Sequence, residues 1–195
     1  YTAAEVDVVE RRVPGPHGDI PVRVYTPEKP SGAGLVWLHG GAFMYGDLDM
    51  PEADSVAREL CARTGAVVVS VDYRLAGPGT RFPAALDDVE AAWRWFAASA
   101  HDLGCDPRRL SLGGASAGGN LAVAGARRLR DRGGPVPAAL LLGYPCLHFP
   151  TPATAHGAVL PDILTFPPER FLEILRNYLG RIDDIALARL SSEDV

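Results

Sequence analysis

Ser116 has the sequence setting best suited to covalent chemistry in this chain. Residues 114–118 read Gly-Ala-Ser-Ala-Gly, which has the G-x-S-x-G spacing. Small residues around a central serine allow a tight turn from a strand into a helix, and such a turn exposes the serine hydroxyl. A strand-like run at residues 109–112 precedes the motif and a helical pattern follows it. The motif is therefore typical of a nucleophilic serine placed where backbone N–H groups converge.

A glycine-rich loop is the second element suited to chemistry. Residues 39–43 read His-Gly-Gly-Ala-Phe and directly follow an apolar run at residues 35–38. Acyl transfer creates a negatively charged oxygen, and backbone N–H donors can stabilise it by about 3 kcal/mol each. Glycine leaves such donors unobstructed by side chains. Both motifs follow predicted strands, so we expect them at the same carboxyl edge of a parallel sheet.

The elements that would position these motifs alternate between strands and helices. Sequence patterns predict a half-exposed strand at residues 22–25 and buried strands at residues 35–38, 67–71, 110–112 and 139–142. Apolar residues at helical spacing predict three helices, marked by Leu86, Val89, Trp93 and Phe96, by Leu121, Gly125 and Leu129, and by Phe171, Leu172, Leu175, Tyr178 and Leu179. Pro167 and Pro168 would open the third helix and Gly180 would close it. This alternation predicts an α/β domain with a mostly parallel sheet and flanking helices.

Composition narrows the classes of protein. The 195 residues are 47% hydrophobic and 22% charged, which suits a single globular domain. The net charge is −5 and the basic cluster at residues 127–132 is confined to a helix end, so no nucleic-acid partner is expected. No apolar run is long enough for a membrane span. Cys61, Cys105 and Cys146 are widely spaced and odd in number, which favours reduced thiols. We expect a cytoplasmic protein that uses no metal and no cofactor.

The motifs together resemble those of the hormone-sensitive-lipase family of bacterial esterases. That family carries H-G-G-G, then D-Y-R-L-A-P, then G-D-S-A-G-G-N. The corresponding residues here are His-Gly-Gly-Ala at 39–42, Asp-Tyr-Arg-Leu-Ala at 72–76 and Gly-Ala-Ser-Ala-Gly-Gly-Asn at 114–120. Two residues depart from the pattern. Ala42 replaces the third glycine of the first motif, and Ala115 replaces the acidic residue beside the serine.

The resemblance implies an α/β-hydrolase fold and a set of site residues. Ser116 would be the nucleophile, and the amides of Gly40, Gly41 and Ala117 would form the oxyanion hole. His39 is expected to bond its own loop rather than carry a proton. Residues 72–74 are expected to brace the loop near Gly40. Residues 43–45 (Phe-Met-Tyr) could line an acyl pocket or belong to the core.

The sequence does not supply a complete catalytic triad. In the family, the acid and the histidine follow two further strands after the serine. After Ser116 this chain has only His148 and His156 as histidines, with Asp131 before them, and none of the three follows a strand of its own. We therefore expect residues 1–195 to be a single partial domain that lacks the last strands, truncated at both ends. The proline-rich segment within residues 147–180 is expected to form a cap or a substrate wall.

Three functions are compatible with these motifs. The first is a serine carboxylic ester hydrolase acting on short or medium acyl esters through an acyl-enzyme at Ser116. The second is a catalytically incomplete, receptor-like protein that binds a ligand without turnover. The third is an amidase or peptidase on the same scaffold, since acyl transfer to water uses the same groups. An incomplete sheet would also expose a strand edge, so association of chains into a homo-oligomer stays open.

Overall fold

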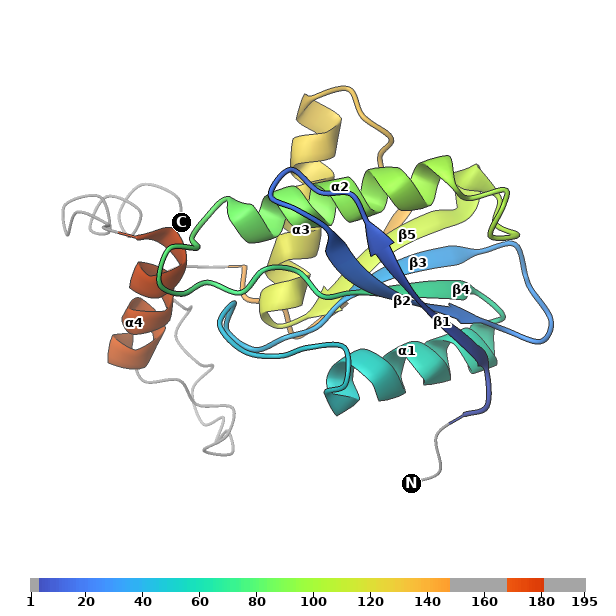
Figure 1. Ribbon diagram of the computed structural model, residues 1–195, viewed down its shortest axis with the longest axis horizontal. Coiled ribbons are helices and arrows are strands. Elements are labelled where there is room, and N and C mark those ends of the chain that lie inside the picture. Colours follow the sequence, from blue (N-terminus) through green and yellow to red (C-terminus); the bar gives the residue numbers. More distant parts are fainter. Residues whose placement is uncertain (1–3, 148–167, 181–195) are drawn as a thin grey trace, which may run out of the picture.

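A six-stranded sheet forms the centre of the molecule. The computed structural model describes residues 4–147 and 168–180, and the strand order is β1-β2-β4-β3-β5-β6 (Figure 1). β1 pairs antiparallel with β2, β2 pairs antiparallel with β4, and the other neighbours are parallel. The strands in chain order are Asp7–Val13, Ile20–Thr26, Gly34–Leu38, Val67–Val71, Leu110–Ala115 and Ala139–Gly143. The prediction of a mostly parallel sheet is confirmed.

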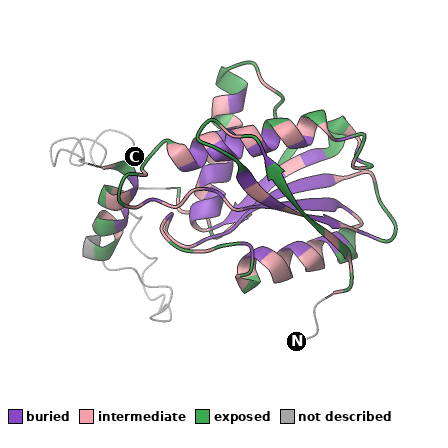
Figure 2. Cartoon of the chain, in the orientation of Figure 1, coloured by how far each residue is buried: buried purple, intermediate pink, exposed green. Residues whose placement is uncertain are grey.

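Helices cover both faces of this sheet. α1 (Pro51–Thr64) lies on one face, and α2 (Ala84–Ala98) and α3 (Ala117–Asp131) lie on the other (Figure 1). Successive residues of a strand point to opposite faces. Trp37 of β3 accordingly packs in a cluster with α1, whereas Val36 and Leu38 pack with α2 and α3. This double coverage explains why β3 and β4 are buried along their whole length (Figure 2).

A fourth helix lies beyond the carboxyl ends of the parallel strands. α4 (Pro168–Leu179) begins at the predicted proline and is followed by Gly180, which has φ 93°. It lies beside the loop that follows β3 (Figure 1). The Asn177 side chain donates to Ala76 O at 3.2 Å, and the Phe82 amide donates to Tyr178 O at 2.8 Å. The rest of the predicted excursion, residues 148–167, lies outside the described residues.

Besides the single 3₁₀ turn Pro107–Arg109, one helix and one strand were not predicted from the sequence. α1 buries only Ala53, Ala57 and Cys61, so small residues form its inner face and no apolar stripe marks it. It is defined by local signals instead, with Pro51 in its first turn and Gly65 in a left-handed conformation at its end. The strand β1 buries only Val13, because it lies at the edge of the sheet.

β6 is a true strand, but the expectation that it is buried is wrong for the described residues. Leu140 and Leu141 are 40% and 44% exposed. β6 is the last strand of the sheet that the structure describes, and β5 is its only strand neighbour there. An apolar run is buried only where other elements cover it. The run of leucines therefore predicts that residues 139–142 form a strand, but it does not predict whether that strand is buried. Within the described residues, no helix is both long enough and apolar enough to cross a membrane.

Candidate active site

Ser116 forms the turn between β5 and α3. Its backbone has φ 52° and ψ −115°, a left-handed conformation that costs a non-glycine residue about 1–3 kcal/mol. The turn is possible because a glycine stands two residues before Ser116 and another two residues after it. A Cβ on Gly114 would lie 2.6 Å from Leu38 O, and one on Gly118 would lie 2.1 Å from the same oxygen. Gly114 and Gly118 therefore let the turn pack directly against the end of β3.

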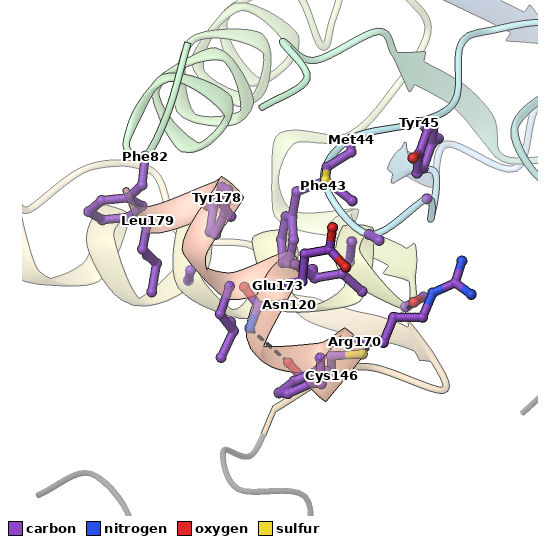
Figure 3. A pocket seen from close by; sticks show the side chains of 18 of the residues that line it. Phe43, Met44, Tyr45, Phe82, Asn120, Cys146, Arg170, Glu173, Tyr178 and Leu179 are labelled. Atoms are coloured by element: carbon purple, nitrogen blue, oxygen red, sulfur yellow. Dashed lines mark hydrogen bonds between the residues drawn. The ribbon is translucent and has the colours of Figure 1, made fainter. Parts of the chain in front are cut away.

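The start of α3 and the segment after β6 surround the Ser116 hydroxyl. The N–H groups in the first turn of a helix have no acceptor within that helix. Ala117 is the first residue of α3, so its N–H group can donate to an acceptor beside Ser116. Ser116 Oγ lies 3.9 Å from Cys146 Sγ, in the segment after β6. The Asn120 side chain donates to Cys146 O at 2.8 Å, which holds that segment against α3 (Figure 3).

The loop after β3 has an unusual backbone. Gly41, Ala42 and Phe43 all have positive φ, at 112°, 54° and 62°. A Cβ on Gly41 would lie 2.0 Å from Tyr45 O, so only glycine fits there. The amides of Met44 and Tyr45 both donate to Gly41 O at 2.9 Å. The chain therefore turns sharply at residues 41–45 and exposes consecutive backbone groups at the end of the sheet.

His39 and Tyr73 brace this loop from within the protein. The His39 side chain is fully buried, and its Nδ1 lies 2.6 Å from Gly40 O. The Tyr73 hydroxyl donates to His39 O at 2.7 Å, and the two rings stack with centroids 4.4 Å apart. Burial raises the pKa of Tyr73, so its hydroxyl stays a donor. These contacts agree with the structural role expected for His39 and with bracing by Tyr73.

Arg74 does not brace the loop, so that part of the expectation is wrong. Its guanidinium pairs with Asp88 Oδ1 at 2.6 Å and donates to Gly18 O at 3.1 Å. The Arg74 amide also donates to Asp88 Oδ2 at 3.0 Å. Burial raises the pKa of Asp88, although the contacts with Arg74 oppose that shift. Arg74 pairs with the buried carboxylate of Asp88 on α2, because leaving that charge unpaired inside the protein would be costly.

Gly40 is not placed as predicted. Its amide donates to Glu52 Oε1 at 2.5 Å, and Gly40 is not among the residues that line the cavity beside Ser116. Gly41 and Ala42 line that cavity instead, together with Ser116 and Ala117. The N–H group of Gly40 is already used within the fold, so the donors available from this loop lie one residue further along. Glu52 was missed from the sequence because it belongs to the unpredicted helix α1.

The cavity has a volume of about 930 Å³ and is mainly apolar. The loop after β3 forms one side and α4 forms another (Figure 3). The Phe43 ring stacks on the Tyr178 ring with centroids 4.0 Å apart. The residues that line the cavity are Gly41, Ala42, Phe43, Met44, Tyr45, Phe82, Ser116, Ala117, Asn120, Ala124, Cys146, Leu147, Arg170, Phe171, Glu173, Ile174, Leu175, Tyr178 and Leu179. The aromatic group at residues 43–45 thus borders the cavity, and Phe43 also belongs to the core.

No histidine that could serve as the general base is identified among the described residues. No histidine of residues 4–147 or 168–180 lines the cavity. Asp131 pairs with Arg130 at 2.7 Å at the far end of α3, away from Ser116. His148 and His156 lie outside the described residues. The described residues also contain no group of three or more His, Cys, Asp or Glu side chains placed to hold a metal ion.

Comparisons with known proteins define the class to which this fold and site belong. Residues 35–194 match the α/β-hydrolase fold family. The chain is 41% identical over 185 residues to the esterase LipI of Mycobacterium tuberculosis, covering 92% of this chain and 56% of LipI. It is 45% identical over 141 residues to the carboxylesterase NlhH of the same organism, covering 70% of this chain and 43% of NlhH. The chain belongs to the α/β-hydrolase family, in its hormone-sensitive-lipase-like branch.

Solved structures agree with this assignment. EstE1, a thermostable carboxylesterase cloned from a metagenomic library, matches with a TM-score of 0.79 and 32% identity, over 97% of this chain and 66% of EstE1. A hyperthermophilic esterase from Pyrobaculum calidifontis matches with a TM-score of 0.78 and 34% identity, over 95% of this chain and 59% of that enzyme. The chain spans about half the length of the curated relatives that it matches.

Proposed function

We propose that the protein is a serine carboxylic ester hydrolase with Ser116 as its nucleophile. The observation that carries the proposal is that Ser116, Gly41, Ala42 and Ala117 line one cavity at the carboxyl edge of the sheet. A nucleophile and several backbone donors on one cavity are the parts that acyl transfer requires. The relatives named esterases and carboxylesterases support the same reaction class.

The reaction would proceed through an acyl-enzyme. Ser116 Oγ attacks the ester carbonyl carbon, its proton passes to a base, and the carbonyl oxygen becomes an oxyanion. We assign the oxyanion to the amides of Gly41, Ala42 and Ala117, with Ala42 in place of Gly40. The tetrahedral intermediate collapses and releases the alcohol, which takes up the proton. Water then attacks the acyl-enzyme, which frees the acid and restores Ser116. In this proposal the base lies outside the described residues.

The cavity supports small-molecule esters with short or medium acyl chains as substrates. Its apolar lining and volume of about 930 Å³ suit a hydrophobic group, since ligand sites of this kind measure about 300–1,000 Å³. α4 supplies one wall of that space, which supports the proposed role of residues 147–180 as a cap or substrate wall.

The test is hydrolysis of p-nitrophenyl butyrate by the complete protein that contains this chain. We expect Ser116→Ala to lower kcat by at least about 10³-fold, because the serine supplies the covalent step. Ser111→Ala, on the same strand but away from the cavity, should keep wild-type activity. Full activity of the Ser116→Ala variant would contradict the proposal. Saturable binding of the ester without turnover by the wild-type protein would favour a receptor-like protein instead.

A further inference from the structure

Glu52 connects the two loops that flank the nucleophile. It lies in the first turn of α1, and its Oε1 accepts the Gly40 amide at 2.5 Å. Its Oε2 accepts the Tyr144 hydroxyl at 2.8 Å. Gly40 follows β3 and Tyr144 follows β6, while β5, which leads to Ser116, lies between these two strands. One carboxylate therefore joins the loops on both sides of the nucleophile's strand.

The hydrogen bond to Glu52 also fixes a peptide plane. In a trans peptide the C=O and N–H groups point in opposite directions. His39 O accepts from Tyr73, and the N–H of the same peptide, that of Gly40, donates to Glu52. The plane is thus held from both sides. The next C=O, that of Gly40, faces His39 Nδ1 at 2.6 Å, so the Gly41 N–H must point away from the His39 ring.

The position of Glu52 excludes direct contact with a substrate in the cavity. Neither Glu52 nor Tyr144 is among the cavity-lining residues, whereas Gly41 and Ala42 are. A built Cβ on Gly40 would lie 2.6 Å from Glu52 Oε1 and 3.3 Å from Ser116 Cβ, so Gly40 fills the space between the carboxylate and the serine. Glu52 therefore acts on the loop that it holds rather than by touching the substrate.

We propose that Glu52, together with Tyr144, is a positioning residue that sets the direction of the Gly41 and Ala42 amides relative to Ser116. A charged acceptor suits this role, because hydrogen bonds to a carboxylate are stronger than neutral ones. The two bonds also occupy both carboxylate oxygens, which fixes the side chain in one orientation. The inference rests on the proposed ester hydrolysis for its kinetic consequence.

Tyr144 is suited to be the second partner of Glu52. Burial together with the hydrogen bond to Glu52 raises the pKa of Tyr144 to about 12. Its hydroxyl is therefore protonated and able to donate at any pH at which an esterase would be assayed. The Tyr144 backbone has φ 34°, a conformation that is uncommon for a residue other than glycine.

Kinetics of Glu52 variants in the complete protein test the proposal. We expect Glu52→Ala to lower kcat for p-nitrophenyl butyrate by about 10-fold or more while KM changes by less than about twofold, because only oxyanion stabilisation is lost. The affinity for a trifluoromethyl ketone inhibitor, which mimics the tetrahedral intermediate, should fall by the same factor as kcat/KM. Glu52→Gln should restore kcat to within about threefold, since its carbonyl can accept from Gly40 and its amide can donate to the Tyr144 oxygen.

A matched control and a second readout separate positioning from folding. Glu59→Ala removes another carboxylate of α1, one that pairs with Arg63 on the surface, and should leave kcat unchanged. Hydrogen exchange measured by mass spectrometry should show faster exchange over residues 39–43 in Glu52→Ala, and wild-type exchange there in Glu52→Gln. This readout needs no activity, so it tests Glu52 even if the wild-type protein hydrolyses no ester and the proposed function fails.

Three results would overturn the positioning role. The first is a wild-type kcat in Glu52→Ala. The second is unchanged exchange over residues 39–43 in that variant. The third is a Glu52→Gln protein that folds normally but is as impaired as Glu52→Ala, which would mean that the charge matters and not the hydrogen bonds.

Discussion

At the scale of single residues, the site depends on backbone conformations that few side chains tolerate. Ser116, Ala42 and Phe43 all have positive φ without being glycine. The position of the nucleophile follows from the sequence, because the small residues around Ser116 permit the tight turn from a strand into a helix. The donor pattern of the loop does not. Whether Gly40 or Ala42 presents its amide to the cavity depends on Glu52 and Tyr73. These two residues are distant in sequence, and they bind the N–H and the C=O of the peptide between His39 and Gly40.

Ala42 carries a conformational cost that a glycine would remove. Its φ of 54° is unfavourable for an L-residue by about 1–2 kcal/mol. We expect Ala42→Gly to raise the free energy of unfolding by up to about 1 kcal/mol, after the larger chain entropy of glycine is subtracted. Urea denaturation of the complete protein measures the change.

A second alanine-to-glycine change provides the control for this effect. Ala124 lies inside α3, where glycine should lower the free energy of unfolding by about 1 kcal/mol. The two substitutions are chemically identical, so opposite signs would isolate the backbone strain. Equal destabilisation by both would contradict a strained Ala42.

At the scale of elements, the spacing of apolar residues in the sequence predicted the strands and helices that have apolar faces. It missed the elements that have none. The helices α2, α3 and α4 were found from their apolar spacing. α1 was missed because alanines and a cysteine form its buried face, although it carries Glu52. A helix of this kind is fixed by its position against the sheet and by its end signals rather than by periodic hydrophobicity.

The packing of α4 on the loop after β3 should control the use of longer acyl chains. The Tyr178 ring stacks on Phe43 and contacts Phe82 edge-on, with centroids 5.8 Å apart. We expect Tyr178→Ala to raise KM for p-nitrophenyl hexanoate by about 5–10-fold, roughly the loss of one aromatic contact, with a smaller effect on the acetate ester. Tyr178→Phe keeps the ring and should behave as wild type. An equal rise in KM for both esters in Tyr178→Ala would argue against this wall.

The contact between α2 and α3 should depend on pH. Burial alone would raise the pKa of Asp87, but hydrogen bonds from His17 and Arg128 outweigh it and lower that pKa. A carboxyl whose pKa is lowered on folding stabilises the protein above its unfolded value of about 3.9 and loses this contribution as the pH falls through the folded value.

Substitution of Asp87 tests this dependence. We expect Asp87→Asn to be less stable than wild type at pH 7, and the difference to shrink as the pH falls below about 4. Chemical denaturation at a series of pH values measures both proteins. A difference that stays constant from pH 7 to pH 3 would show that the charge of Asp87 contributes nothing.

At the scale of the whole molecule, the order of the strands brings together motifs that are far apart in sequence. β3 and β5 are neighbours in parallel register, so Leu38 lies opposite Gly114 and the two following loops share one cavity. The sequence predicts this meeting, because parallel strands end at the same edge. It does not predict which strands are covered. If the protein forms a homo-oligomer, the exposed leucines of β6 are the surface at which we would look for the contact between chains.

Covalent labelling of the complete protein tests the central claim most directly. Diethyl p-nitrophenyl phosphate reacts with an activated serine to form an O–P bond and releases nitrophenolate. We predict one diethylphosphate group per chain, located by mass spectrometry on the peptide that contains Ser116, with hydrolysis of p-nitrophenyl butyrate lost in proportion to labelling. A label on any other residue, or full activity after complete labelling of Ser116, would contradict the account.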